Sequence, residues 1–234
     1  MPNYYHATTA AGHIITLSDG NSKLISNAAT RFLIFSLPAV KTCPFSTAEC
    51  RLACYALKAE RLYPECNVSR ARNHAATMDA DFVETMVSLI ERIMKNSRNF
   101  KACKKVLFRI HESGDFYSRA YLDKWLQIAA IVGRKYPQFV FAAYTKSIDF
   151  FFDGAALRAD IPENFVVSAS VWADTDPDLA RRSFDFFKVY TAYTADKVDA
   201  LVKSGEFGRC RCSDCATCQR CYTKKCRHTA CVIH

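Results

Sequence analysis

The sequence has no long apolar run, and no stretch approaches the ~18 consecutive apolar residues that a membrane-spanning helix requires. The first residues, Met1 to Ala7, contain neither a basic start nor an apolar segment, so no signal peptide is expected. A Gly-rich phosphate loop, a serine nucleophile elbow and a His-Glu-x-x-His pattern are also missing, which argues against the enzyme classes that carry them. We therefore expect a soluble cytoplasmic protein that does not associate with membranes.

The chain also lacks internal repeats and low-complexity linkers. Half of its 234 residues are hydrophobic and 13% are aromatic, a composition that excludes general disorder and supports a sizeable core. A chain of this length is long for one domain and short for two, so we expect one core with a small appendage.

Cysteine, by contrast, is abundant, with 12 residues in the chain. The cytosol keeps thiols reduced, so clustered cysteines in a cytoplasmic protein indicate metal ligands rather than disulfides. Disulfides are the alternative if the source is a hyperthermophile.

The formal net charge is +9, from 32 Lys and Arg against 23 Asp and Glu. A 4Fe–4S cluster with four thiolates carries about −2, so bound clusters would reduce this surplus. Basic residues that surround the C-terminal cysteines either compensate this charge or form a patch for nucleic acid or an acidic partner. They are Lys203, Arg209, Arg211, Arg220, Lys224, Lys225 and Arg227.

Short apolar, β-branched runs alternate with longer amphipathic segments. The apolar runs predict strands at residues 31–37, 105–111, 139–144, 165–170 and 187–192. Helical periodicity predicts helices at residues 68–94, 121–136, 176–186 and 195–204, the last capped by Thr194 and ended by Gly205. This alternation is typical of an α/β fold with a parallel sheet of about five or six strands and helical crossovers, built as a partial βα barrel or a doubly wound sheet. We expect an α/β core over residues 1–207 and a cysteine-rich metal-binding tail over residues 208–234.

In both architectures the chemistry belongs at the carboxyl ends of the strands. The first predicted strand is followed there by Cys43, Cys50 and Cys54. Cys50 and Cys54 are four residues apart and would face one way on a helical turn. Three thiolates can hold a 4Fe–4S cluster by three irons and leave the fourth iron open for a substrate. The alternative is that the three cysteines are small hydrophobic residues.

The second group of cysteines is denser and lies in the tail. It comprises Cys210, Cys212, Cys215, Cys218 and Cys221. The C-x2-C-x2-C-x2-C run from Cys212 to Cys221 is close to the ferredoxin spacing for a 4Fe–4S cluster. Zinc is the rival metal, although zinc sites usually separate two cysteine pairs by a longer loop. Cys226 and Cys231 exceed the needs of one cluster and are spare, resolving or zinc-binding, and Cys66 and Cys103 are expected to be core residues.

Polar residues follow the second predicted strand in the same way. His111, Glu112 and Asp115 are candidates for acid–base catalysis or substrate orientation, or else cap the next helix and fill the strand end. Arg70, Arg72, Asn73 and His74 follow the first cysteine group, and they bind a carboxylate or phosphate or form a solvated helix start.

Several of these segments together resemble the phage-associated gene product 88 family. The resemblance is carried by Gly20 to Leu24, the stretch Cys43 to Ala56, the stretch Arg109 to Phe116, and the terminal Cys215-x2-Cys218-x2-Cys221-Tyr222 run. These segments match in order over nearly the whole chain. The family has no established activity, so the resemblance implies the architecture more than the function. Cys226 and Cys231 depart from its usual tail.

The chain is also similar, more distantly, to radical S-adenosylmethionine (SAM) enzymes, which combine a partial βα barrel with three cluster cysteines after the first strand. This resemblance implies a catalytic cluster on Cys43, Cys50 and Cys54 and an auxiliary cluster on the tail cysteines. It further implies that Ser113, Gly114 and Asp115 bind the methionine amino group of SAM. The spacing of the three cysteines, x6 then x3, departs from the x3 then x2 of that superfamily.

These observations predict an iron–sulfur enzyme, redox or radical SAM-like, that acts on a small molecule with one or two clusters and a possible redox partner. A second hypothesis is a non-catalytic, metal-stapled module that binds nucleic acid through its basic tail. A third is an iron–sulfur electron-transfer or carrier protein.

Overall fold

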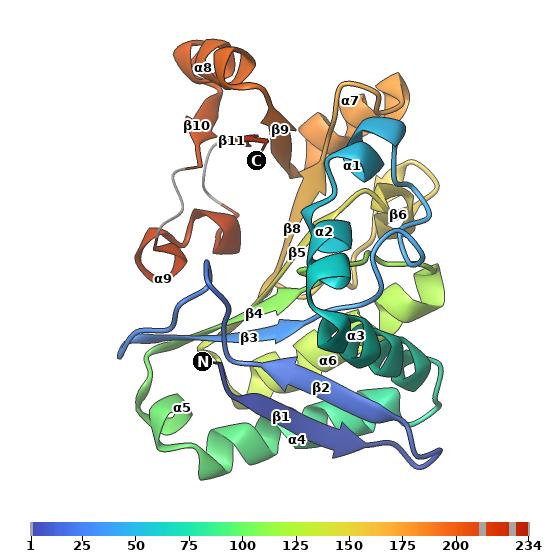
Figure 1. Ribbon diagram of the computed structural model, residues 1–234, viewed down its shortest axis with the longest axis vertical. Helices are drawn as coiled ribbons and strands as arrows, with labels where there is room; N and C mark the ends of the chain where they lie inside the picture. Colours follow the sequence, from blue (N-terminus) through green and yellow to red (C-terminus); the bar gives the residue numbers. More distant parts are fainter. Residues whose placement is uncertain (1, 211–213, 225–227, 234) are drawn as a thin grey trace.

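The computed structural model of the chain describes residues 2–210, 214–224 and 228–233 (Figure 1). Within these residues the main sheet has nine strands in the order β1-β2-β3-β4-β5-β8-β9-β11-β10. They are β1 (Tyr4–Thr8), β2 (Ile14–Ser18), β3 (Thr30–Phe35), β4 (Lys105–Ile110), β5 (Phe139–Thr145), β8 (Phe165–Ser170), β9 (Lys188–Tyr193), β10 (Phe207–Arg209) and β11 (His228–Val232). The short strands β6 (Phe152–Asp153) and β7 (Ala156–Leu157) form a separate hairpin.

The sheet is parallel from β3 to β10, whereas β1 and β2 are antiparallel additions at one edge. All five predicted strands are confirmed as β3, β4, β5, β8 and β9. These five follow one another across the sheet in chain order, without the reversal of order that defines a doubly wound sheet. The sequence prediction missed β1, β2, β10 and β11, so the main sheet is larger than the five or six strands expected.

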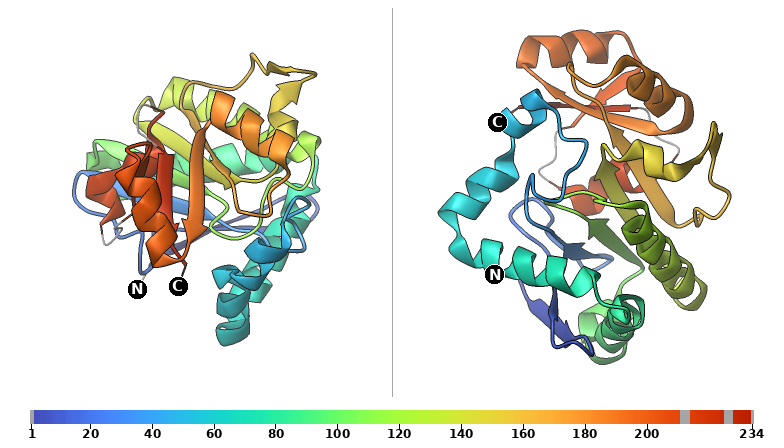
Figure 2. Two further views of the ribbon diagram at one scale, coloured as in Figure 1. Left: turned by 90° about the horizontal axis from the view of Figure 1, so that it is seen from above. Right: turned by 90° about the vertical axis from the view of Figure 1, so that its right-hand side faces the viewer.

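Helices connect the parallel strands. They are α1 (Ala48–Leu52), α2 (Tyr55–Leu62), α3 (Pro64–Thr77), α4 (Phe82–Asn96), α5 (Arg98–Ala102), α6 (Arg119–Lys135), α7 (Pro177–Phe186), α8 (Ala195–Lys203) and α9 (Cys215–Cys218), with 3-10 turns η1 (Ile148–Phe151) and η2 (Arg220–Tyr222). In the right-hand view of Figure 2, α1 and α2 lie at the left of the molecule and α6 at the right. The end of α3 reaches α6, where Lys124 donates to the Thr77 carbonyl (2.8 Å). No helix among the described residues is both long and apolar enough to cross a membrane.

The predicted helix over residues 68–94 is in fact two helices, α3 and α4, separated at residues 78–81. The turn between β1 and β2 docks against this break. The Asp79 carboxylate accepts hydrogen bonds from Thr9 (2.5 Å) and His13 (2.9 Å), and the Asp81 carboxylate accepts one from the Ala10 amide (2.8 Å). Helical periodicity continues across the break, so only these tertiary contacts reveal it. The predicted Thr194 cap occupies the N-cap position of α8 without a side-chain capping bond.

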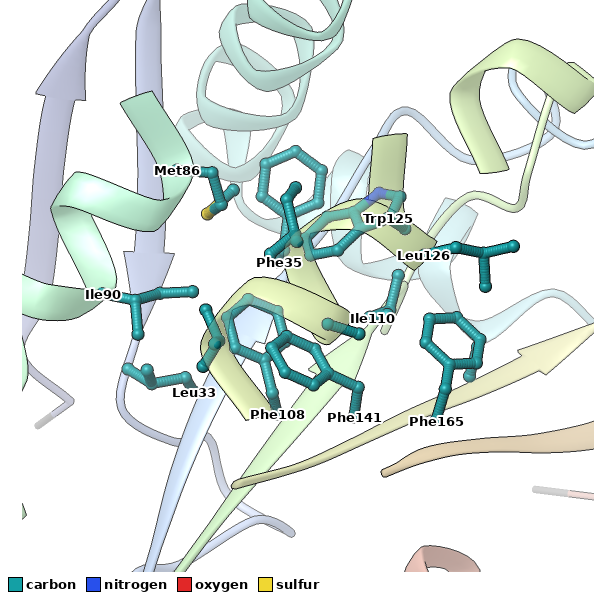
Figure 3. Packing of buried hydrophobic residues seen from close by; sticks show 14 of the residues in the cluster. Leu33, Phe35, Met86, Ile90, Phe108, Ile110, Trp125, Leu126, Phe141 and Phe165 are labelled. Atoms are coloured by element: carbon teal, nitrogen blue, oxygen red, sulfur yellow. The ribbon is translucent and has the colours of Figure 1, made fainter. Parts of the chain in front are cut away.

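The two faces of the central strands carry different cores, because side chains alternate along each strand. One face packs on α4 and α6 through a large apolar cluster in which Phe108 and Phe141 stack with ring centroids 5.0 Å apart and Trp125 lies against Phe108 (Figure 3). The opposite face carries Phe32, Leu107, Ala142 and Val166, and the tail covers it. The described residues of the tail therefore pack on this second face, and β10 and β11 extend the same sheet.

Asn73 explains how α3 joins the antiparallel edge to the parallel sheet. Strands β2 and β3 pair at a single register position, Ser18 with Ile34. The buried Asn73 amide bridges them: its oxygen accepts from the Thr16 amide (2.7 Å), and its nitrogen donates to the carbonyls of Thr16 (3.1 Å) and Ser36 (3.0 Å). Arg70 is also buried, in an ion pair with Glu60 (3.0 Å). Arg70 and Asn73 are thus structural residues of the core and not a solvated helix start.

Candidate metal centre

The loops that follow β3 and β4 interlock at the carboxyl edge of the sheet. The Leu37 amide donates to the Ser113 carbonyl (2.8 Å), and the Asp115 amide donates to the Thr42 carbonyl (3.2 Å). Gly114 sits between them with φ +85°, and a Cβ atom there would lie 2.6 Å from both the Leu37 Cβ and the Thr42 Oγ1. Only glycine fits this conformation and this space. The crossing fixes the start of the loop that carries the first cysteines.

Val40 stands in this loop with φ +61°, in the left-handed region that a β-branched residue rarely adopts. Replacing it with glycine should relieve the backbone strain and raise the free energy of unfolding by about 1 kcal/mol, after the smaller loss of packing and chain entropy. Urea unfolding of Val40→Gly against the wild type measures this difference. An unchanged or lower stability would show that the loop does not store this strain.

Cys43, Cys50 and Cys54 are brought together by this loop. Cys43 is half-buried in the turn before α1, Cys50 lies on α1 with the Thr47 side chain capping its amide, and Cys54 is the N-cap residue of α2. Burial, together with the neighbouring Asp115, Cys50 and Cys54, raises the pKa of Cys43 to about 12. Burial also raises the pKa of Cys50, and Lys146 opposes that effect. The three thiols are therefore close enough to influence one another electrostatically.

Lys146 and Asp115 are the buried charged residues beside the thiols. Lys146 follows β5, is buried, and donates from Nζ to the Ser170 carbonyl (3.0 Å). Burial lowers its pKa, while Cys50 and Asp115 raise it. Asp115 is buried, and its carboxylate accepts from Thr145 Oγ1 (2.5 Å), the Lys146 amide (2.8 Å) and the Phe116 amide (2.7 Å). Burial nevertheless raises the pKa of Asp115 to about 6.

The other predicted residues of the second loop point elsewhere. His111 lies in the aromatic core, where its Nε2 hydrogen-bonds to the Tyr121 hydroxyl (2.8 Å) and its ring contacts Phe116. Burial lowers its pKa to about 3, so the ring is neutral. Glu112 accepts a hydrogen bond from Asn21 (2.5 Å) through its carboxylate and another from the Tyr55 hydroxyl through its carbonyl. The Ser113 hydroxyl is buried without a hydrogen-bond partner.

The tail lies across the opposite face of the sheet. Ala216 and Tyr222 are buried there, with the Tyr222 ring 5.9 Å from that of Phe32. Gln219 adopts φ +48° at the end of α9 and contacts the first residues of two strands, accepting from Lys105 Nζ (2.8 Å) and donating to Thr30 Oγ1 (3.2 Å). Tertiary contacts of the tail thus replace the helix that usually covers the second face of a parallel sheet.

Cys215, Cys218 and Cys221 line one small cavity in the docked tail, together with Gln219, Arg220 and Tyr222. Cys210 is not among these lining residues; it follows β10. Cys212 and Cys226, which the sequence analysis also named, lie outside the described residues. Across the described part of the chain, no group of three or more His, Cys, Asp or Glu side chains has the geometry to hold a single metal ion.

Arg109 and Tyr144 lie between the two groups of cysteines. The Arg109 guanidinium stacks over the Tyr144 ring at 3.7 Å from its centroid, and its Nε donates to the His111 carbonyl (3.3 Å). Burial, and then the neighbouring Cys221 thiol, raises the pKa of Tyr144. Sequence reasoning missed Lys146, Tyr144 and Arg109 as site residues. For Lys146 the available signal was its position directly after a predicted strand. Tyr144 and Arg109 are revealed as site residues only by the docking of the tail.

Taken together, the fold and site define an α/β protein with a mostly parallel sheet and one cysteine group at its carboxyl edge and another in a docked tail. A family model described as Gene product 88 matches residues 15–233, so the chain belongs to the Gene product 88 family. This confirms the resemblance drawn from the motifs.

Two relatives are phage proteins described as Gene 88 proteins. The chain is 35% identical over 108 residues to the Gene 88 protein of Mycobacterium phage L5 and 34% identical over 108 residues to that of Mycobacterium phage D29. Each alignment covers 45% of this chain, and it covers 43% and 42% of those relatives, so less than half of their length is matched. No solved structure matches the chain. None of these matches is to a radical SAM enzyme.

Proposed function

We propose that this chain is an iron–sulfur redox protein in which Cys43, Cys50 and Cys54 hold a 4Fe–4S cluster that is open at one iron. The observation that carries the proposal is the convergence of these three thiols at the carboxyl edge of the sheet, beside the buried Lys146. This edge is where parallel sheets place their chemistry.

The proposal is a cluster and not a single ion, because in the described part of the chain no three His, Cys, Asp or Glu side chains have the geometry to hold one metal ion. Thiolates on one zinc ion share a tight tetrahedron with Zn–S bonds of about 2.3 Å. Each thiolate of a cubane binds a different iron, so the three sulfurs stand further apart. Burial raises the pKa of Cys43 and Cys50, which makes bare thiolates unfavourable there. Metal ligation removes these protons, and the Lys146 ammonium would offset part of the cluster's negative charge.

The tail supports a second centre. Cys215, Cys218 and Cys221 line the same cavity, and Cys212 completes the ferredoxin-like spacing in the sequence. Arg109 and Tyr144 lie beside Cys221, between the tail cysteines and the group of Cys43, Cys50 and Cys54. When bound, the two clusters would supply one-electron chemistry. The protein would position a small-molecule substrate at the open iron and pass electrons to it from a redox partner through the tail.

SAM is not carried into this proposal, because the loop predicted to bind it is already occupied by protein contacts. Leu37 and Thr42 fill the space beside Gly114. Both oxygens of the Asp115 carboxylate accept hydrogen bonds from protein donors. His111 is likewise committed to the aromatic core, so of the residues proposed as catalytic only Asp115 lies beside the thiols.

The nucleic-acid-binding alternative rests on the basic tail, and Arg209 there is ion-paired with Asp199. Arg211, Lys225 and Arg227 lie outside the described residues. A carrier protein would need no buried Lys146 and Asp115 next to its cluster, and this favours the redox-enzyme proposal over the electron carrier.

Metal analysis of cysteine variants tests the proposal. Anaerobically purified wild-type protein should contain iron and acid-labile sulfide, with iron exceeding zinc several-fold. Cys50→Ala should stay folded and lose only part of its iron, because the tail thiols remain. Cys218→Ala should lose the complementary part, and Cys66→Ala, a cysteine on α3 outside both groups, should lose none.

Three outcomes would count against the proposal. Stoichiometric zinc without acid-labile sulfide after anaerobic reconstitution would overturn the cluster assignment. Loss of all iron in Cys50→Ala would show that the two groups share one cluster. Iron retained in full by Cys50→Ala would remove the centre at the carboxyl edge.

A further inference from the structure

Cys210 and Cys231 lie side by side on neighbouring parallel strands. The register pairs Phe207 with His228 and Arg209 with Ala230, and the Cys210 amide donates to the Ala230 carbonyl (2.7 Å). The next pair in this register is Cys210 with Cys231. The Cys231 thiol hydrogen-bonds with Cys210, and this contact, followed by burial, raises the pKa of Cys231. Paired positions on adjacent strands lie within the Cα separation that a disulfide spans.

The two thiols differ in how far they are exposed to solvent. Cys231 is buried, its Sγ donates to the Val232 carbonyl (3.4 Å), and it also hydrogen-bonds with the Tyr190 hydroxyl. Cys210 is only half-buried, at the end of the edge strand β10. A small oxidant in solution can therefore reach the Cys210 thiol first. The Cys231 thiol is buried and in hydrogen-bond contact with it.

The position of this pair in the chain separates it from the metal ligands of the tail. Every other tail cysteine lies between these two in the sequence, at positions 212, 215, 218, 221 and 226. Cys215, Cys218 and Cys221 line a cavity to which neither Cys210 nor Cys231 contributes. With Cys212, those three already supply the four thiolates of one cluster.

We propose that Cys210 and Cys231 form a reversible dithiol–disulfide pair that closes the neck of the cysteine-rich tail and does not ligate metal. The oxidant is a low-molecular-weight disulfide such as oxidised glutathione. The Cys210 thiolate attacks one glutathione sulfur, and the first glutathione leaves as a thiolate. Cys231 then attacks the Cys210 sulfur of the mixed disulfide and expels the second glutathione.

The reaction balances without a further reactant. One S–S bond of the oxidant is broken and one S–S bond is formed between the two strands. The two protein thiols are oxidised by two electrons, the oxidant is reduced to two glutathione thiols, and the two protons of the cysteines pass to these products. The result covalently joins the three-residue edge strand β10 to β11 and holds the tail loop at its base whether or not metal is bound.

Thiol mapping of the full-length, metal-loaded protein tests the inference. The protein is equilibrated anaerobically in glutathione buffers of increasing oxidised fraction, alkylated, digested and analysed by mass spectrometry. The expected result is a cross-linked peptide pair containing Cys210 and Cys231, two hydrogen atoms lighter than the separate peptides, with unchanged iron content. In Cys231→Ser, Cys210 should instead accumulate as the glutathione mixed disulfide, because the resolving thiol is gone. Cys103→Ser, a buried cysteine elsewhere in the core, should behave as the wild type.

Two results would overturn it. The first is a Cys210 that resists alkylation until a chelator is added and whose replacement by serine lowers the iron content, which would make Cys210 a metal ligand. The second is Cys210 cross-linked to several tail cysteines without preference for Cys231. Neither result bears on the centre at Cys43, Cys50 and Cys54, which the iron analysis tests separately.

Discussion

Gly114→Ala is expected to lower the free energy of unfolding by about 4 kcal/mol. The φ of +85° costs an L-residue about 1–2 kcal/mol, and the new Cβ would lie 2.6 Å from both the Leu37 side chain and Thr42 Oγ1. Forcing a methyl group into a packed site adds about 1–3 kcal/mol, since both neighbours are held by the crossing of the two loops. Urea unfolding followed by circular dichroism measures the difference.

Gly12→Ala is the matched control for this experiment. Gly12 has nearly the same φ, +87°, but no atom lies within 4 Å of the Cβ that alanine would add. Its substitution should therefore cost only the conformational part, about 1–2 kcal/mol. Equal losses in the two variants would mean that Gly114 is required for its backbone conformation alone and that the loop crossing is not tightly packed.

Acidification from pH 7 to pH 5 is expected to cost the wild-type protein about 2 kcal/mol more than it costs His111→Gln. The pKa of His111 is about 3 in the folded protein because the ring is buried, and it is 6.5 in the unfolded chain. Its folded-state pKa is depressed, so its contribution to stability is full above about pH 6.5 and is lost as the pH falls toward 3. Each pH unit in this window is worth about 1.4 kcal/mol. Urea unfolding at both pH values gives the comparison.

Asp115 supplies a control of opposite sign. Burial raises its pKa from 3.8 to about 6, so its contribution to stability is full below about pH 4 and is lost as the pH rises through 6. Asp115→Asn should therefore lose about 1 kcal/mol more than the wild type on the same acidification. Parallel pH profiles for the wild type and His111→Gln would show that His111 is not buried in a neutral form.

The central strands were predictable because their residues are apolar on both faces. Segments such as 105–110 and 165–170 carry enough buried hydrophobic side chains to identify them without knowledge of their neighbours. The strands that were missed have no such signal. Tyr4–Thr8 alternates between exposed and partly buried residues, and His228–Val232 lies within a cysteine-rich segment whose composition indicates metal binding.

In the candidate site, too, some features were predictable from the sequence and others were not. The spacing of Cys43, Cys50 and Cys54 after a strand end predicts their grouping, and Asp115 follows the adjacent strand end. His111 and Asp115 are only four residues apart, yet His111 turns into the aromatic core with φ +61° while Asp115 turns toward the thiols. No periodicity in the sequence distinguishes these two directions, because they depend on how the two loops cross at Gly114.

By itself, the sequence determined the class of fold, the five central strands and the two groups of cysteines, because these follow from local hydrophobicity and from spacing along the chain. The tertiary structure alone decided where helix 68–94 breaks, how the tail docks on the open face of the sheet, and which side chains meet the thiols. Asp79 at the break, Gln219 at the docked tail and Lys146 beside Cys50 each act on residues far away in the chain. Such contacts leave no periodic or compositional trace in the segments that make them.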